Sequence, residues 1–228
     1  MGLINRLLSF FGRNNQKQTK IIATDASGNV QTLDPTDILM ITPTIENTFP
    51  EFEKTSGINN LQIFEDDWRQ IEFISKDQKG SIDQEIDSIN YIFEHEMHQG
   101  PGYSAFKKVH VRRLITKPIL LSFDRVKEYL VDTASEMAGI TVNGNGGQIK
   151  NGFSISSKGL NYYGLRDDTN NVSILCFYGA DTDEDLAKSI DNVSRLLATE
   201  HLYLVDWVHR KIVDEKNIKD FFGANDSR

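Results

Sequence analysis

The stretch VSILCFYGADTDEDLAKSIDNVSRLLATEHLYLVDWVHRKIV (residues 172–213) contains the two patterns that decide the fold. Residues 172–179 and 202–213 are rich in β-branched and aromatic side chains, which favour strands. Between them, apolar residues recur at the three- and four-residue spacing of one helix face: Leu186, Ile190, Val193 and Leu197. This order of strand, amphipathic helix and strand predicts a fold that mixes both kinds of element.

The first half of the chain repeats this order. Ser81 and Gln84 form a capping box at the start of a helix that we expect over about 82–98. The glycine and proline residues at 100–102 should stop this helix, because neither residue type continues one. The strands predicted on either side of it are WRQIEFIS (68–75) and FKKVHVRRLI (106–115). The two halves therefore share an outline, which is compatible with two similar α/β units.

Turn-forming sequences account for much of the remaining chain. Residues 19–34 predict a β-hairpin, and residues 122–139 predict a further amphipathic helix. Three Asn-Gly pairs lie between residues 143 and 152, and the strands around and after them predict an antiparallel meander. The expected fold class is α+β, with antiparallel or mixed sheets and about three amphipathic helices packed on them.

We expect three segments along the chain. Residues 1–20 read as an amphipathic helix followed by a polar linker, residues 21–116 as an N-terminal α+β unit, and residues 117–228 as a C-terminal α+β unit with the meander. The last two units are also compatible with one compact domain. The apolar stripe within residues 3–13 is too short to be stable alone, so it needs a surface such as the protein, a sister subunit or a membrane.

The charge of the chain is unevenly distributed. The formal net charge is -8, yet residues 1–20 hold four basic side chains and no acidic one, so the remaining chain has 21 basic and 33 acidic residues. An acidic body argues against nucleic acid as a partner, because Lys and Arg neutralise phosphates in most such complexes. It favours a protein partner with a basic surface, or serves only solubility.

The single cysteine limits the chemistry of the chain. Cys176 lies within an apolar run, where a buried small side chain is the expected role. One cysteine excludes an intrachain disulfide framework and a cysteine-based zinc site, and it fits a reducing cytoplasm. The sequence contains no P-loop and no dinucleotide-binding glycine pattern, so we predict no cofactor.

One cluster of residues resembles part of a metal site. Glu94, His95 and His98 lie near the end of the predicted helix, and histidines three positions apart can share a helix face. Zinc proteases instead place them four apart in HExxH, which this chain lacks. The expected apolar stripe points away from both histidines, so a solvated or adventitious pair is the simpler interpretation.

A short basic stretch and two tryptophans are candidate binding residues. On a strand, Lys108, His110 and Arg112 would share one face and could bind an anionic ligand or an acidic partner. They could equally pair with residues 65–67 (EDD) or other internal acids. Trp68 and Trp207 each follow an aspartate and suit a binding surface, although half-buried strand aromatics are commoner.

Three functional hypotheses follow from these features. The first is a non-enzymatic interaction module, such as an accessory, scaffold or immunity-type protein, that binds a basic partner. The second is a metal-binding protein or metal-dependent hydrolase that uses His95 and His98. The third is a peripheral membrane protein anchored weakly by residues 3–13.

Overall fold

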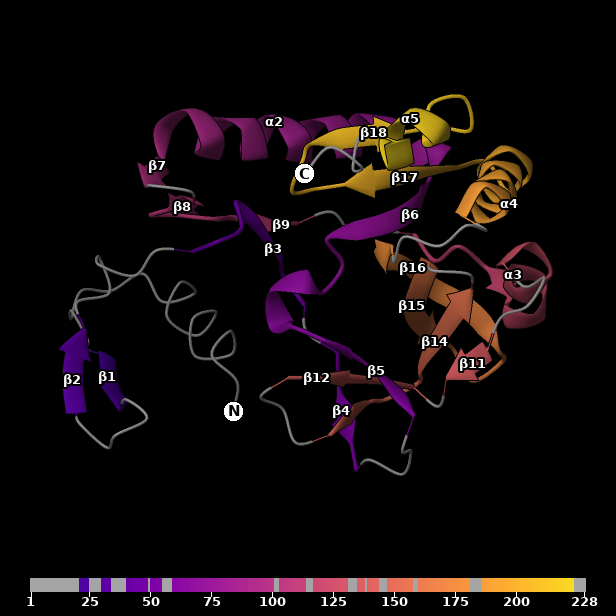
Figure 1. Cartoon of the computed structure of the whole chain (residues 1–228), viewed down its shortest axis with the longest axis horizontal. Coiled ribbons are helices and arrows are strands. Elements are labelled where there is room, and N and C mark those ends of the chain that lie inside the picture. Colours follow the sequence, from indigo (N-terminus) through magenta and orange to yellow (C-terminus); the bar gives the residue numbers. More distant parts are fainter. Residues whose placement is uncertain are drawn as a thin grey trace.

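The computed structural model has the predicted α+β fold, with mixed and antiparallel sheets and helices on their faces (Figure 1). The predicted N-terminal helix lies outside the described residues. The predicted hairpin is confirmed, because β1 (Ile21–Thr24) pairs antiparallel with β2 (Val30–Leu33). The described residues are 21–24, 30–33, 40–48, 50–54, 59–100, 103–113, 117–130, 135–137, 139–143, 147–157, 160–180 and 186–223.

An eight-stranded antiparallel sheet forms the centre of the molecule. Strand β6 comes from the first half of the chain, yet it lies between β16 and β17 from the second half. The two halves therefore share one sheet. In spatial order its strands are β11 (Ser135–Met137), β14 (Gly152–Ser157), β15 (Leu160–Arg166), β16 (Asn171–Ala180), β6 (Ile71–Ser75), β17 (Leu202–Asp206) and β18 (Lys211–Val213), and β10 (Leu121–Ser122) pairs with β16.

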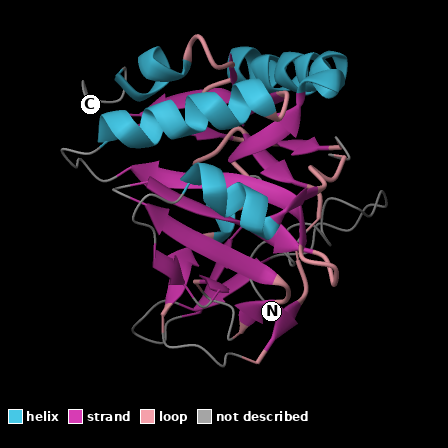
Figure 2. Cartoon of the chain, turned by 90° about the vertical axis from the view of Figure 1, so that its right-hand side faces the viewer, coloured by secondary structure: helices cyan, strands magenta, loops and turns pink. Residues whose placement is uncertain are grey.

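Three helices cover one face of this sheet: α3 (Phe123–Leu130), α4 (Leu186–Thr199) and α5 (Ile218–Gly223). Figure 2 shows α3 and α4 lying across the strands. Their apolar residues form the main core with the strands, as Val126, Leu197 and Phe222 pack with Phe153 and Leu204. This burial is the main source of stability in the fold.

The opposite face of the sheet carries two smaller apolar clusters. Under α2 (Lys79–His95), Ile82 and Ile89 pack against Trp207. Farther along the face, Ile63 and Val142 belong to a second small sheet that packs against Tyr163 and Cys176 of the main sheet. The strands of this second sheet are β4 (Phe52–Glu53), β13 (Gln148–Ile149), β12 (Gly139–Val142) and β5 (Asn60–Ile63).

Two short ribbons complete the fold. The parallel pair β3 (Thr44–Glu46) and β9 (His110–Arg112) lies beside α2, and β7 (Met97–Gly100) forms a hairpin with β8 (Tyr103–Phe106). Two 3-10 helices, η2 (Glu65–Asp67) and η3 (Lys76–Gln78), flank β6.

Several predicted boundaries were wrong. The strand expected over 202–213 is a hairpin, because β17 ends at Asp206 and pairs antiparallel with β18, which begins at Lys211. The helix expected to reach residue 98 ends at His95, because residues 97–100 pair with residues 103–106 instead. The strand expected over 106–115 is therefore split between β8 and β9. The helix expected over 122–139 ends at Leu130, because residues 135–137 pair with β14. In each case pairing with another strand outweighs the local pattern.

Two glycines provide a test of this packing. A Cβ on Gly164 of β15 would lie 1.9 Å from the carbonyl oxygen of Ile174, whereas a Cβ on Gly80 of α2 would meet nothing within 4 Å. Gly164→Ala should lower the free energy of unfolding by about 2 kcal/mol through overpacking. Gly80→Ala should leave it unchanged or raise it by about 0.5 kcal/mol through helix propensity. Urea denaturation measures both, and equal effects would contradict the strand packing.

Candidate functional site

A cluster of four buried charged side chains lies on the face of the main sheet between the two smaller apolar clusters. Glu72 of β6 and Glu46 of β3 provide the carboxylates, and Arg69 and Arg112 provide the guanidinium groups. Arg69 contacts Glu72 at 2.7 Å and Glu46 at 3.5 Å, and Arg112 lies 3.7 Å from Glu46. Two positive and two negative groups make the cluster formally neutral, as the burial of charges requires.

Burial acts on the two guanidinium groups with different results. At Arg69 burial opposes the charge, but the carboxylates of Glu72 and Glu46 more than compensate and raise its pKa. At Arg112 burial dominates and lowers the pKa, because Glu72 and Glu46 offset it only in part. Arg112 is 1% exposed, so these partners and not water stabilise its charge.

Neutral groups add further hydrogen bonds to the cluster. Trp207 Nε1 donates to Glu72 at 2.9 Å, and Arg112 donates to the backbone carbonyl of Arg69 at 2.9 Å. Arg112 also donates to the Gln70 side chain at 3.2 Å, while Gln70 in turn donates to the carbonyl of Thr44 at 3.0 Å. The contacts tie β3 and β9 to the turn before β6.

Tyr163 and Cys176 border this cluster on the main sheet. The Tyr163 hydroxyl accepts from the Arg69 backbone N–H at 2.8 Å and donates to the Asp67 carbonyl at 3.0 Å. This bond holds Arg69, whose φ of 55° is unusual for a residue with a side chain. Cys176 lies opposite Glu72, and burial raises the pKa of its thiol. The cysteine is therefore an unreactive buried group, as expected.

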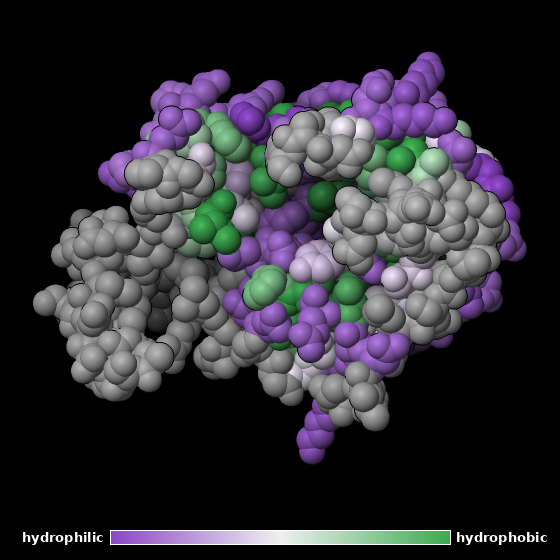
Figure 3. Space-filling model, viewed as in Figure 1, coloured by the Kyte–Doolittle hydropathy of each residue, from purple (hydrophilic) through white to green (hydrophobic). Residues whose placement is uncertain are grey.

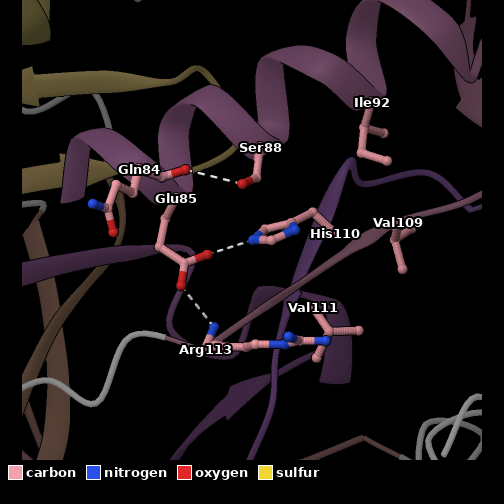
Figure 4. Close-up of a pocket in the computed structure, with 8 residues that line it drawn as sticks. All are labelled: Gln84, Glu85, Ser88, Ile92, Val109, His110, Val111 and Arg113. Carbon is pink, nitrogen blue, oxygen red and sulfur yellow. Dashed lines mark hydrogen bonds and ion pairs between the residues drawn. The ribbon is translucent and has the colours of Figure 1, made fainter. Parts of the chain in front are cut away.

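A groove of about 460 Å³ runs between α2 and β9 beside the cluster (Figure 4). Glu85 of α2 spans it: one carboxylate oxygen is bonded to His110 Nε2, and the other accepts the backbone N–H of Arg113 at 2.8 Å. The groove is lined by Gln84, Glu85, Ser88, Ile92, Val109, His110, Val111 and Arg113. Its helix wall is largely polar, and its strand wall includes two valines.

The predicted basic ladder does not form one open face. Lys108 lies before β9 and pairs with Glu96 at 2.7 Å, His110 is bonded to Glu85, and Arg112 is buried in the charged cluster. All three therefore pair internally. Their partners are other glutamates and not residues 65–67, because β9 lies beside α2 and β3.

The two tryptophans lie in turns at strand ends and are buried. Trp68 is 3% exposed and packs on Tyr163 with ring centroids 5.6 Å apart. Trp207 is fully buried under α2, with the Arg112 guanidinium 5.4 Å from its ring centroid. The expectation that they present a binding surface is wrong for both, and so is their placement on strands.

The predicted metal residues do not share a helix face. His95 is the last residue of α2, where its ring stacks on Tyr91 at 4.1 Å and Nδ1 donates to the Tyr91 carbonyl at 2.9 Å. His98 lies in strand β7, so the spacing of three no longer brings it beside His95. Glu94 is exposed on the helix. Among the described residues, no group of three or more His, Cys, Asp or Glu side chains is placed to hold a metal ion.

A second hollow of about 420 Å³ lies beside the β7–β8 hairpin and was not predicted. At its rim Asp206 accepts both the backbone N–H of His209 at 2.9 Å and its Nδ1 at 2.7 Å. Arg210 lies 3.6 Å from the centroid of the Phe93 ring. An aspartate that binds the backbone three residues on is a turn device, so this pair shapes the turn from β17 to β18.

An acidic stripe on α2 is the surface feature that the sequence interpretation missed. We define it as Asp83, Asp87, Tyr91 and Glu94, which face away from the sheet at helical spacing. Figure 3 shows hydrophilic residues along the edge formed by α2. Tyr91 is 56% exposed, and Asp83 pairs with Lys79 at 2.5 Å. The helical spacing that predicts a buried face with Ile82 and Ile89 also predicts that these four residues lie on the exposed face of the helix.

No protein-family model, no curated protein and no solved structure matches the chain. None of the helices in the described part of the chain is long and apolar enough to cross a membrane.

The buried cluster predicts a contrast between adjacent arginines. Arg112→Met should lower the free energy of unfolding by about 3 kcal/mol, because it leaves two buried carboxylates with a single guanidinium. Arg113→Met, which changes an exposed side chain, should change it by less than about 0.5 kcal/mol. Chemical denaturation of both variants provides the comparison, and an unaltered stability of Arg112→Met would contradict the role given to the cluster.

Proposed function

We propose that the protein is a non-enzymatic interaction module, of the accessory, scaffold or immunity type, that binds a protein partner with a basic surface. The observation that carries this proposal is the acidic stripe on α2. It combines three carboxylates with an exposed tyrosine on a rigid helix. Tyrosine is enriched at interface hot spots, and carboxylates attract and orient a basic partner.

The pairing of the charges on α2 supports this location. Asp87 and Glu94 form no ion pair with a described residue, whereas Glu85 and Glu96 are engaged with His110 and Lys108. Charges without an internal partner are available to a second protein. The acidic excess of the chain beyond residue 20 has the same sign, so it reinforces long-range attraction of a basic protein.

Most of the residues whose side chains could take part in chemistry are buried and bonded internally, which supports a structural role for them. Glu46, Arg69, Glu72 and Arg112 are engaged with one another, and Cys176 is kept as a thiol by burial. Asp206 and His209 hold a turn. These groups have structural roles within the fold, and the exposed stripe on α2 is left for recognition.

The test begins with the untagged protein as bait and mass spectrometry of what it retains from the native cell. We expect one basic protein, whose affinity for the purified chain falls as salt is raised. If no specific protein is retained, the proposal is wrong. A partner whose affinity does not depend on salt would exclude recognition by charge.

The acidic stripe makes a specific prediction for that partner. Asp87→Asn combined with Glu94→Gln should weaken binding about fivefold at low salt, because exposed charge pairs are each worth about 0.5 kcal/mol. The matched control is Glu53→Gln with Asp168→Asn. It removes the same charge from exposed positions around Lys150, and β4 lies at the opposite end of the molecule from α2 (Figure 1). Equal losses for both double variants would mean that net charge, and not the stripe, determines binding.

A further inference from the structure

Strand β9 has one paired edge and one open edge. The backbone N–H of His110 donates to the Pro43 carbonyl at 2.9 Å, and the His110 carbonyl accepts from the Thr44 hydroxyl at 2.9 Å. His110 therefore directs its backbone groups toward β3. Because backbone groups alternate along a strand, Val111 directs its N–H and C=O to the other side.

That other side faces the groove. Arg113 has the same orientation as Val111, and its N–H reaches Glu85 of α2 across the groove. Glu85 uses its second oxygen on His110, so neither of its oxygens is left for Val111. Among the described residues none pairs with the N–H of Val111. The side chains of Val109 and Val111 point away from α2, so they leave this edge open (Figure 4).

We propose that an extended segment of the protein partner adds to the open edge of β9 as a further strand, lying in the groove beside α2. This inference rests on the proposed function and names its mode of recognition. Val111 supplies a donor and an acceptor to the backbone of the segment, and an exposed edge with both is a template for strand addition.

The walls of the groove indicate the chemistry of the segment. Alternate side chains of an added strand point to opposite faces, so one set lies along α2 and the other along the valines of β9. On α2 the groove residues Gln84 and Ser88 lie three positions before Asp87 and Tyr91 of the acidic stripe, so each is next to a stripe residue on the helix surface. A segment that alternates basic and apolar residues therefore fits both walls: the basic side chains meet the stripe, and the apolar ones meet Val109 and Val111.

A synthetic peptide tests the inference without the partner. The probe is a blocked, fluorescent seven-residue peptide that alternates lysine and valine, and its binding is followed by fluorescence anisotropy. The same peptide with two adjacent central amides N-methylated has lost backbone donors on both edges, and a glutamate–valine peptide reverses the charge. We expect the lysine–valine peptide to bind at least tenfold more tightly than either control. Absence of binding, or equal binding of the N-methylated peptide, would overturn strand addition.

Variants at Val111 separate the backbone from the side chain. Val111→Pro removes the N–H on the open edge, where proline is tolerated because no ladder bond to β3 is lost. Val111→Ala keeps the N–H and shortens the side chain. Val111→Pro should weaken binding of the lysine–valine peptide at least tenfold, and Val111→Ala less than threefold. Similar affinities for both variants would count against the proposal.

Hydrogen exchange covers the case in which Val111→Pro does not fold, as circular dichroism would reveal. In the wild-type chain the Val111 amide should exchange at least tenfold more slowly when the peptide is bound, and an unchanged rate would overturn the inference.

The proposed function of the acidic stripe and the strand addition at β9 can be wrong independently of each other. A basic partner that still binds Val111→Pro fully would leave the proposed function intact while excluding β9. If the lysine–valine peptide binds but no protein partner is retained, the open edge of β9 can take an added strand while the proposed function is wrong.

Discussion

The packing of the ribbon β3–β9 depends on the burial of Arg112 among Glu46, Glu72 and the backbone carbonyl of Arg69. Glu72 lies on the central strand β6, while Glu46 and Arg112 belong to the ribbon itself. One guanidinium therefore ties the ribbon to the sheet at the point where the apolar clusters under α2 and under the small sheet meet. Removal of a single charge there leaves the other three desolvated and no longer neutral as a group, which is why the four groups act as a unit.

The same contact determines which parts of β9 reach the surface. With Arg112 directed inward, alternation places the Val111 side chain on the outer face, and the pairing with β3 leaves the Val111 backbone on the open edge. Glu85 then closes the end of that edge by binding Arg113 and His110. The inward orientation of Arg112 thus produces both the buried cluster and the groove, although only the groove is open to a ligand.

Much of the main sheet could be predicted from the sequence, whereas the environment of individual side chains could not. Runs of branched and aromatic residues located β16 and β17, and helical spacing located α2 and α4, because these signals are local. The partners of Arg112 lie 66 and 40 positions away, so the sequence allowed pairing with internal acids but could not identify Glu46 and Glu72 as those acids. Trp207 was misplaced for the same reason, since its N–H donates to Glu72 of the neighbouring strand β6, 135 positions away in the sequence. His98 lies outside the helix because it pairs with Ala105 of β8.

The charged cluster also explains why β9 has a single register. A shift by one residue would place Val111 opposite Glu46 and turn the Arg112 side chain to the outer face, which leaves the two buried carboxylates with Arg69 alone. A purely apolar strand would tolerate such a shift at a much lower free-energy cost. We infer that the cluster selects the register, and with it which backbone groups line the groove. A partner that adds a strand would therefore bind backbone groups of β9 whose orientation is fixed by the buried Arg112, although the Arg112 side chain itself does not reach the surface.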